Sequence, residues 1–261
     1  YRVTTNLDIP EGLTADRLGR SKNTIHTEII SEITVNKGSK RVDFKTSIDN
    51  KSKDHMLIAS FSTGIDSDYA DWECPFEIRA RDVEKFSNNN GIKGPELERQ
   101  AVQNFIDVSD GTRGVALFTK GIKEAGTIRG EGAIINLTLF RATTGTFPIY
   151  NDLQVSFENE TSQCMGRQTF EYSIYMHRGN FKEGNVIAES RKYATPLISA
   201  EIGSGTGGCL KGDISFMKLN GGQLVLHAVK LAEDGKGIVM RLSNPTGDVV
   251  KEEISFMNGI K

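Results

Sequence analysis

The chain has 261 residues, a formal net charge of −2 and a sequence pI of about 6.2. Its hydrophobic fraction of 37% and charged fraction of 25% are typical of an ordinary folded protein rather than a disordered one. The near-neutral charge argues against nucleic acid and anionic membrane as partners, because both attract a basic surface. No apolar run approaches the ~20 residues that a membrane-spanning helix needs. The length suits one large β domain or two smaller domains.

The three cysteines are Cys74, Cys164 and Cys209. Their odd number and long spacings favour neither a disulfide framework nor a Cys/His metal site. They predict thiols in a reducing compartment, and therefore a cytoplasmic protein. The first residues, YRVTTNLDIPEGL, contain no initiator Met and no signal-peptide pattern. We therefore expect a processed chain or a part of a longer protein.

Alternating apolar and polar residues dominate the first half of the chain. In RVDFKTSID (41–49), Val42, Phe44 and Ile48 share one face of a predicted strand. The next segment, HMLIASFST (55–63), is more continuously apolar and predicts a strand covered on both sides. The best helical candidate is PELERQAVQNF (95–105), because Pro suits a first helical turn.

A hairpin is predicted directly after this candidate helix. In QNFIDVSDGTRGVALFTKGIKEAG (103–126), the strands FIDV and GVALF flank the dipeptide Asp110–Gly111. Glycine tolerates the positive φ that a two-residue hairpin turn requires. The segment therefore predicts two antiparallel strands joined by a tight turn.

Further β-type segments follow, and they predict an all-β sandwich. They are GAIINLTLFRA (132–142), FEYSIYM (170–176), QLVLHAVKL (223–231) and GIVMRLSNPTG (237–247). The glycine-rich GSGTGG (203–208) is the best linker candidate. We therefore divide the chain into residues 1–203 and residues 209–261.

No catalytic or metal-binding motif is visible in the sequence. The four histidines, His26, His55, His177 and His227, are far apart and have no ligand spacing. GSGTGG lacks the GxxxxGK[ST] pattern of a phosphate loop, and no GxSxG element occurs. Trp72, the one tryptophan, is predicted to lie in the core. A glycosidase carboxylate pair meets in space rather than in sequence, so that possibility stays open.

Five stretches, in order, resemble the C-terminal β region of family 38 glycoside hydrolases, the α-mannosidases, especially the bacterial branch that includes mannosylglycerate hydrolase. They are RVDFKTSIDNKSKDHMLIASFST, QNFIDVSDGTRGVALFTKGIKEAG, LTLFRA, QCMGRQTFEYSIYMHRG and HAVKLAEDGKGIVMRLSNPTG. The resemblance covers most of the chain, although no single stretch is highly specific. It implies a large two-sheet supersandwich similar to galactose mutarotase over residues 1–203. It also implies part of a smaller β-sandwich over residues 209–261.

The resemblance also places the chemistry elsewhere. In the family, a separate N-terminal α/β domain carries the Asp nucleophile of a retaining mechanism, and His and Asp residues there hold zinc or another divalent metal. No segment of this chain matches that domain's His-x-Asp segment. We therefore expect no catalytic residue, metal ligand or cofactor in this chain, and no activity from it alone. The implied partners are a mannose-containing carbohydrate and the N-terminal catalytic domain of the same protein.

The segment ELERQAVQNFID (96–107) is the candidate substrate-binding element. It is dense in planar polar side chains that suit sugar hydroxyls, and it precedes the hairpin at a point where a loop leaves a rigid sheet. The site residues that we predict are Glu98, Arg99, Gln103 and Asn104. The alternative is an ordinary solvated connection.

Two other functions remain open from sequence alone. A freestanding carbohydrate-binding module would need exposed aromatic platforms, and one Trp with six Tyr is a thin supply. A mutarotase-like sugar epimerase would need a His and a Glu converging on the open face of a sheet. His177, at the end of FEYSIYM, is the candidate for that role.

Overall fold

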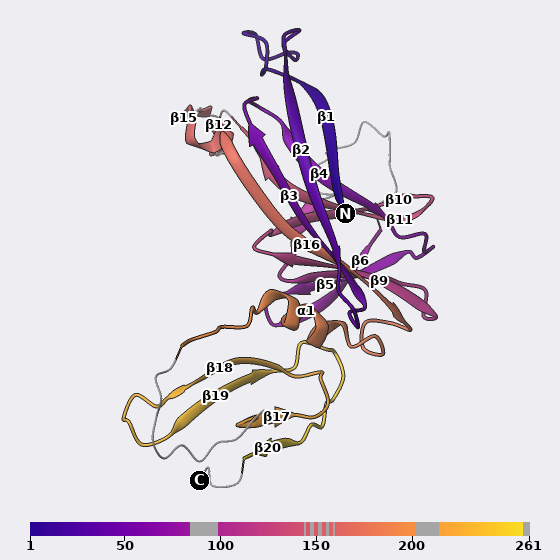
Figure 1. Ribbon diagram of the computed structural model, residues 1–261, viewed down its shortest axis with the longest axis vertical. Helices are drawn as coiled ribbons and strands as arrows, with labels where there is room; N and C mark the ends of the chain where they lie inside the picture. Colours follow the sequence, from indigo (N-terminus) through magenta and orange to yellow (C-terminus); the bar gives the residue numbers. More distant parts are fainter. Residues whose placement is uncertain are drawn as a thin grey trace.

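The computed structural model describes residues 1–83, 99–143, 160–201 and 214–257, and also the backbone of four short strands between residues 145 and 158. Strands make up nearly all of its regular structure, with one α-helix and one 3-10 helix in the described part (Figure 1). The predicted all-β fold is therefore confirmed.

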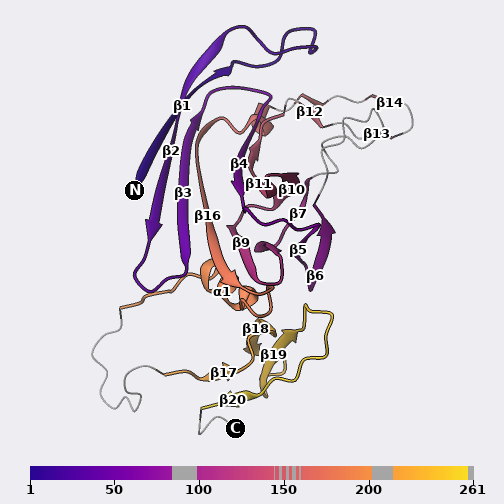
Figure 2. The ribbon, with the colours of Figure 1, turned by 90° about the vertical axis from the view of Figure 1, so that its right-hand side faces the viewer.

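An eight-stranded antiparallel sheet, here called the large sheet, forms the body of the protein. Its central strand β16 comes late in the chain and lies between β3 and β9 (Figure 2). In spatial order the strands are β1 (Arg2–Pro10), β2 (Thr24–Val35), β3 (Arg41–Asn50), β16 (Gly166–Arg178), β9 (Arg113–Lys120), β8 (Phe105–Ser109), β5 (Tyr69–Cys74) and β6 (Glu77–Asp82).

A four-stranded antiparallel sheet, the small sheet, packs against one face of the large sheet. Its order is β4 (Met56–Ser62), β11 (Gly132–Arg141), β10 (Glu124–Gly130) and β7 (Arg99–Ala101). The 3-10 helix η1 (Glu160–Gln163) precedes β16. Four two-residue strands lie between β11 and η1: β12 (Gly145–Thr146), β13 (Ile149–Tyr150), β14 (Leu153–Gln154) and β15 (Phe157–Glu158).

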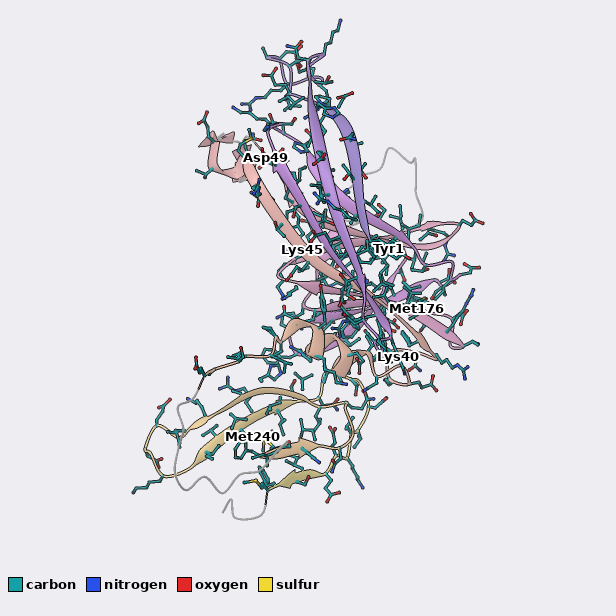
Figure 3. The ribbon with its side chains drawn as sticks, in the orientation of Figure 1. Tyr1, Lys40, Lys45, Asp49, Met176 and Met240 are labelled. Atoms are coloured by element: carbon teal, nitrogen blue, oxygen red, sulfur yellow. The ribbon has the colours of Figure 1, made fainter. Side chains whose placement is uncertain are left out.

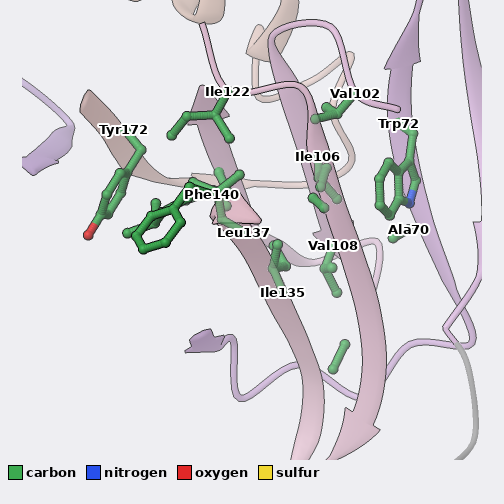
Figure 4. Packing of buried hydrophobic residues seen from close by; sticks show 14 of the residues in the cluster. Ala70, Trp72, Val102, Ile106, Val108, Ile122, Ile135, Leu137, Phe140 and Tyr172 are labelled. Carbon is green, nitrogen blue, oxygen red and sulfur yellow. The ribbon is translucent and has the colours of Figure 1, made fainter. Parts of the chain in front are cut away.

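The main core fills the space between the two sheets (Figure 4). Trp72, Ile106 and Leu117 from the large sheet pack with Ile135 and Leu137 from the small sheet, all at most 2% exposed. Trp72 is thus a core residue, as predicted. Because burying each such side chain stabilises the fold by about 1.5–3 kcal/mol, this layer is the chief source of stability.

A second core lies on the opposite, outer face of the large sheet. Phe105 and Phe118 pack there beneath the helix α1 (Val186–Ala194), which contributes Val186 and Ile187. β8 is therefore buried on both faces. This two-sided burial explains why FIDV and GVALF are almost continuously apolar.

Strands that are buried on one face keep the alternating pattern of apolar and polar residues. One prediction, for β4, is wrong. In β3, Ile48 is buried between the sheets, whereas Lys45 faces solvent. β4 was predicted to be covered on both sides, but its residues are mostly half-buried. β4 is the edge strand of the small sheet, so part of its continuous apolar run stays exposed.

The predicted helix over residues 95–105 is wrong where the structure describes it. Arg99–Ala101 forms strand β7, which pairs with β10 through Gly126 and Arg99. Residues 95–98 lie outside the described part. Pairing with a neighbouring strand here outweighs the weak local preference for helix.

The last described strands lie beside α1 and form two two-stranded sheets (Figure 1). They are β17 (Met217–Leu219) with β20 (Ile254–Phe256), and β18 (Val225–Leu231) with β19 (Ile238–Ser243). The Pro245 carbonyl accepts a hydrogen bond from the Ile78 N–H, and Lys182 pairs with Asp248. The linker candidate 203–208 lies outside the described residues, so the division at residues 203 and 209 stays a prediction.

The predicted hairpin is present, but its turn is displaced by one residue from the predicted dipeptide: the Asp110 N–H donates a hydrogen bond to the Arg113 carbonyl at 3.2 Å, so Gly111 and Thr112 lie at the tip. Ser109 pairs with Gly114, and residues 110–113 connect them. The Asp110 carboxylate accepts hydrogen bonds from the Thr112 and Arg113 N–H groups, and Gly111 has φ +83°. The aspartate side chain thus adds two hydrogen bonds to the backbone bond that closes the turn.

Gly111→Val should lower the free energy of unfolding by about 1 kcal/mol or more, because a β-branched residue resists positive φ. Chemical denaturation of both proteins measures the change. Gly247→Val is the matched control, since Gly247 has open space around it and no positive φ. Equal losses in the two variants would contradict the role assigned to Gly111.

Candidate functional site

Polar side chains gather on the outer face of the large sheet, and α1 divides this face into two halves. The half under α1 contains a buried polar cluster from β5, β8 and β16. The other half, over β1, β2 and β3, is open.

The predicted substrate-binding residues occupy different environments. Arg99 is half-buried in β7 of the small sheet. Gln103 and Asn104 lie in the connection to β8, where the Gln103 carbonyl accepts a hydrogen bond from Lys123 Nζ at 2.7 Å. Glu98 lies outside the described residues. The structure therefore brings Gln103 and Asn104 together at the start of β8 and places Arg99 on the other sheet.

Asn104 belongs to a buried clamp. It is 8% exposed, and its amide donates a hydrogen bond to Glu73 Oε2 at 2.9 Å. The other carboxylate oxygen of Glu73 accepts a hydrogen bond from Arg191 on α1. Burial raises the pKa of Glu73, although Arg191 and Asn104 oppose that rise. The clamp fastens α1 to β5.

A second buried group joins Asp107 on β8 with His177 on β16. His177 Nε2 lies 2.7 Å from Asp107 Oδ1, and the two side chains are 2% and 0% exposed. Burial lowers the pKa of His177, but the hydrogen bond and charge of Asp107 outweigh it, so the pKa is raised. The buried carboxylate of Asp107 therefore favours the imidazolium form of His177.

Asp71 faces the same pair from the next strand. It lies directly opposite Asp107 in the β5–β8 ladder. Burial, reinforced by the charge of Asp107 and opposed by Lys182, raises the pKa of Asp71 to about 6. Two carboxylates and one imidazole thus share one partly desolvated region.

The His177–Asp107 pair is sealed from substrate, whereas Asp71 is half-buried. The His177 ring is wedged between Gly114 and Gly184, where a Cβ would lie 2.2 Å from ring atoms at either glycine. A general acid or base must come within hydrogen-bonding reach of the proton that it moves. His177 and Asp107 have no such access to a sugar, so their contact joins β8 to β16 across the intervening strand β9.

The open half of the face carries a row of alternating charges. Arg2, Glu32, Lys45, Glu171 and Lys120 lie directly opposite one another across β1, β2, β3, β16 and β9. Lys120 and Glu171 form an ion pair of 2.6 Å. Figure 3 shows Lys45 and Asp49 along β3. Opposite charges in directly opposed positions stabilise the strand register.

A groove of about 740 Å³ lies between this row and the end of α1. Charged residues of both signs line it, together with Tyr193 and Leu197. The Arg41 guanidinium lies 5.3 Å from the centroid of the Tyr193 ring. Burial and the nearby carboxylates raise the pKa of Tyr193, so its phenol stays protonated. The groove offers hydrogen-bonding groups and charged side chains of both signs.

Within the described ranges, no three His, Cys, Asp or Glu side chains are placed to hold a metal ion. The divalent metal that the family resemblance assigns to a separate domain therefore has no fitting ligand set in this part of the chain. In the same residues, no helix is long and apolar enough to cross a membrane.

Sequence reasoning missed the cluster around Asp71, Glu73 and Arg191. One signal was available: Asp107 interrupts the apolar strand FIDV, which is unusual for a strand buried on both faces. The partners of Asp107 could not be read from the sequence, since His177 lies 70 positions later.

Comparison with known proteins now gives the family. The model of the glycosyl hydrolases family 38 C-terminal domain matches residues 6–147, which is more than half of the chain. The chain therefore belongs to this family, as the sequence resemblance predicted.

Three curated relatives match along most of the chain. They are a Halalkalibacterium halodurans protein named "Putative mannosylglycerate hydrolase" (26% identity over 88% of this chain), alpha-mannosidase G of Dictyostelium discoideum (25% over 82%) and alpha-mannosidase 2C1 of Mus musculus (24% over 86%). The chain spans 24%, 18% and 20% of their respective lengths.

Solved structures agree with the fold. A family 38 glycosyl hydrolase from Enterococcus faecalis superposes with a TM-score of 0.83 at 23% identity, covering 98% of this chain and 30% of that chain. An alpha-mannosidase from Enterococcus faecalis V583 gives 0.81 at 22% identity, covering 98% and 29%. At such identities the likeness establishes the fold alone.

Asp71→Asn should stabilise the protein at neutral pH. When the pKa of a carboxyl is higher in the folded state than in the unfolded state, the protein loses stability as the pH rises between the two pKa values. For Asp71 these are about 3.9 in the unfolded state and about 6 in the folded state. Above about pH 6 the free energy of unfolding of the parent stays at this reduced level. The variant avoids the loss, because asparagine cannot ionise. Urea unfolding should give the variant roughly 1–2 kcal/mol of added stability at about pH 7.5 and little advantage near about pH 4.

The matched control is Asp49→Asn, because Asp49 also lies on the large sheet but its side chain is 54% exposed. It should leave stability nearly unchanged across the same pH range. A constant difference between Asp71→Asn and the parent at every pH would contradict the assignment.

Proposed function

We propose that the chain is the non-catalytic C-terminal β region of an α-mannosidase-type glycoside hydrolase. The whole enzyme would hydrolyse α-mannosides by a retaining mechanism, with zinc or another divalent metal in its N-terminal catalytic domain. The name of the Halalkalibacterium halodurans relative makes mannosylglycerate one candidate substrate. We propose a cytoplasmic location, on the cysteine content. The role of this chain would be to support the catalytic domain and wall its sugar site.

The observation that carries this proposal is the sealing of Asp107 and His177. These side chains have the chemistry of an acid–base pair, but the Gly114 and Gly184 backbones and the segment before α1 enclose them. Family membership supports a glycosidase, while the geometry supports a structural role for this pair. The cleavage chemistry is therefore assigned to the catalytic domain.

The two other functions are less favoured. A mutarotase-like epimerase would need His177 on an open sheet face, and its side chain is 2% exposed. A freestanding carbohydrate-binding module would need an aromatic platform, yet Trp72 is in the core. The exposed aromatic ring of Phe76 already contacts another side chain, since its centroid lies 5.2 Å from that of the His227 ring.

Within the proposed role, Arg99 and Gln103 are the residues suited to touch substrate. Both side chains are half-buried in the described structure, so each keeps some exposed surface. Glu98 is also proposed to bind substrate, on the basis of the sequence alone. Asn104 would act through another residue, since its amide holds the Glu73 carboxylate.

The purified chain alone should cleave no aryl α-mannoside and bind no stoichiometric zinc. We expect this because the nucleophile and the metal ligands are proposed to lie in the separate catalytic domain. Hydrolysis assays and metal analysis of the same preparation measure both properties. Robust turnover would contradict the proposed non-catalytic role. One bound zinc per chain would contradict the assignment of the metal to the catalytic domain.

In the intact enzyme, Arg99→Ala and Gln103→Ala should each lower kcat/KM for an α-mannoside about tenfold or more, because a lost hydrogen bond to a sugar hydroxyl costs ~1–2 kcal/mol. Their melting temperatures should stay near that of the parent. Steady-state kinetics and thermal unfolding give the two readouts.

Asn104→Ala is the control for a purely structural effect. It leaves Glu73 buried with one donor fewer, so it should lower the free energy of unfolding by about 1–3 kcal/mol. Parental kinetics in both Arg99→Ala and Gln103→Ala would remove this segment from the substrate site.

A further inference from the structure

One oxygen of a buried carboxylate lacks a hydrogen-bond partner in the half of the large sheet that α1 covers. The side chain of Asp107 is 0% exposed, and its Oδ1 lies 2.7 Å from His177 Nε2. Its Oδ2 is also buried, and no described residue donates a hydrogen bond to it. Burying a carboxylate oxygen without a donor costs free energy, because nothing replaces the water that it loses. A donor for Oδ2 is therefore expected next to Asp107.

His177 does not provide this second donor. Its Nδ1 lies 3.2 Å from the Arg178 carbonyl oxygen, which can only accept a hydrogen bond. Its Nε2 is directed at Oδ1 of Asp107. Both ring nitrogens therefore act as donors, as in the imidazolium form, and neither is left for Oδ2.

Asp71 is the side chain placed to donate to Oδ2. It lies directly opposite Asp107 in the β5–β8 ladder, so the two Cβ atoms are about 4.5–5.5 Å apart on one face of the sheet. A protonated carboxyl carries one O–H donor, whereas an ionised one carries none. Burial and the charge of Asp107 raise the pKa of Asp71 to about 6, which favours the protonated form below that pH. One proton on Asp71 thus satisfies Oδ2 and removes the repulsion between the two carboxyls.

The outer face around Asp71 carries charged groups from several elements. They are Asp107 of β8, His177 of β16, Glu73 of β5, Arg191 of α1 and Lys182 of the segment between β16 and α1. From β6, the uncharged Ala80 lies opposite Asp71. The His177 imidazolium and the Arg191 guanidinium already have carboxylate partners. Among the described residues, Lys182 is therefore the cation that an ionised Asp71 attracts, and its charge already opposes the rise in the pKa of Asp71.

Lys182 also fastens the last four strands to the sandwich. Its Nζ forms an ion pair with Asp248, and the two side chains are 34% and 62% exposed. Close by, the Pro245 carbonyl accepts a hydrogen bond of 2.8 Å from the Ile78 N–H of β6. One ammonium group thus lies between the buried carboxyl pair and the segment that follows β19.

We propose that Asp71 donates its proton to Oδ2 of Asp107, and that loss of this proton draws Lys182 from Asp248 and loosens the contact of residues 214–257 with the sandwich. With Asp71 neutral, Lys182 pairs with Asp248. On ionisation the proton leaves to solvent from the half-buried Asp71, and the new carboxylate attracts the ammonium group. The contact is firm below about pH 6 and weaker above it. This device does not depend on the proposed function, because none of its residues takes part in the substrate site proposed above.

The amide of Ile78 reports this contact, because it donates to the Pro245 carbonyl. The N–H of Arg79, the next residue, points toward β5 instead, since neighbouring residues of an antiparallel strand alternate in direction. Hydrogen–deuterium exchange of the intact protein, resolved to single amides, gives a protection factor for each amide. Between about pH 5 and about pH 7.5 the protection factor of Ile78 should fall about two- to fivefold relative to that of Arg79, which is the effect of losing a partly exposed ion pair.

Two variants separate the proton from the ion pair. Asp71→Asn cannot ionise, so Ile78 should keep its protection at both pH values. Asp248→Asn removes the partner of Lys182 at every pH, so Ile78 should be less protected at the lower pH already and change little at the higher one. Parental pH dependence in either variant would overturn the proposal.

The parent protein provides two further ways to overturn it. The first is a protection ratio of Ile78 to Arg79 that does not change with pH. The second is a ratio that rises with pH, which is the result expected if Lys182 bridged Asp71 and Asp248 instead of exchanging one for the other.

Infrared difference spectra test the proton itself. At about pH 5, the spectrum of the intact parent minus that of Asp71→Asn should contain the C=O stretch of a protonated carboxyl, and this band should vanish by about pH 7.5. Absence of the band at the lower pH would show that Asp71 is ionised there, and the proposal would fail.

Discussion

Two-sided burial of β8, β9 and the middle of β16 (residues 172–175) is the constraint on which the rest of the structure depends. Strands covered on both faces must supply apolar side chains in both directions, and every polar group among them needs a partner. Phe105 and Phe118 meet this demand on the outer face, and Ile106 and Leu117 meet it between the sheets. The small sheet and α1 can be understood as the two covers that this central region requires.

The polar exceptions follow from the same constraint. Asp107 lies on β8 with 0% of its side chain exposed, so its charge must be compensated locally. His177 provides that compensation, and the Glu73–Arg191 ion pair fastens the helix that covers both groups. This chain thus contains acid–base groups that lie in a packed interior. Burial, rather than residue type, separates this structural group from a catalytic one.

Sequence alone predicted what depends on local pattern. Alternation in RVDFKTSID and FEYSIYM identified β3 and β16, and Asp110–Gly111 identified the hairpin between β8 and β9. The errors arose where distant pairing decides. Residues 99–101 form a strand because β10 lies beside them, and β4 is half-buried because it is an edge strand. The site was least predictable: Arg191 meets Glu73 from 118 positions away. Family resemblance supplied the enzyme class, which no local pattern contained.

The position of β16 has a consequence for how the chain acquires its structure. β16 is the last strand of the large sheet to be synthesised, yet it lies between β3 and β9. Until residues 166–178 leave the ribosome, the large sheet exists as two pieces, β1–β2–β3 and β9–β8–β5–β6, each with an open inner edge. Pairing of β3 with β16 closes a loop of more than a hundred residues, as with Thr46 and Phe170. Such long-range closure is slow, and unpaired strand edges expose intermediates to aggregation. Joining the two pieces therefore depends on the longest-range strand pairing in the described sheet.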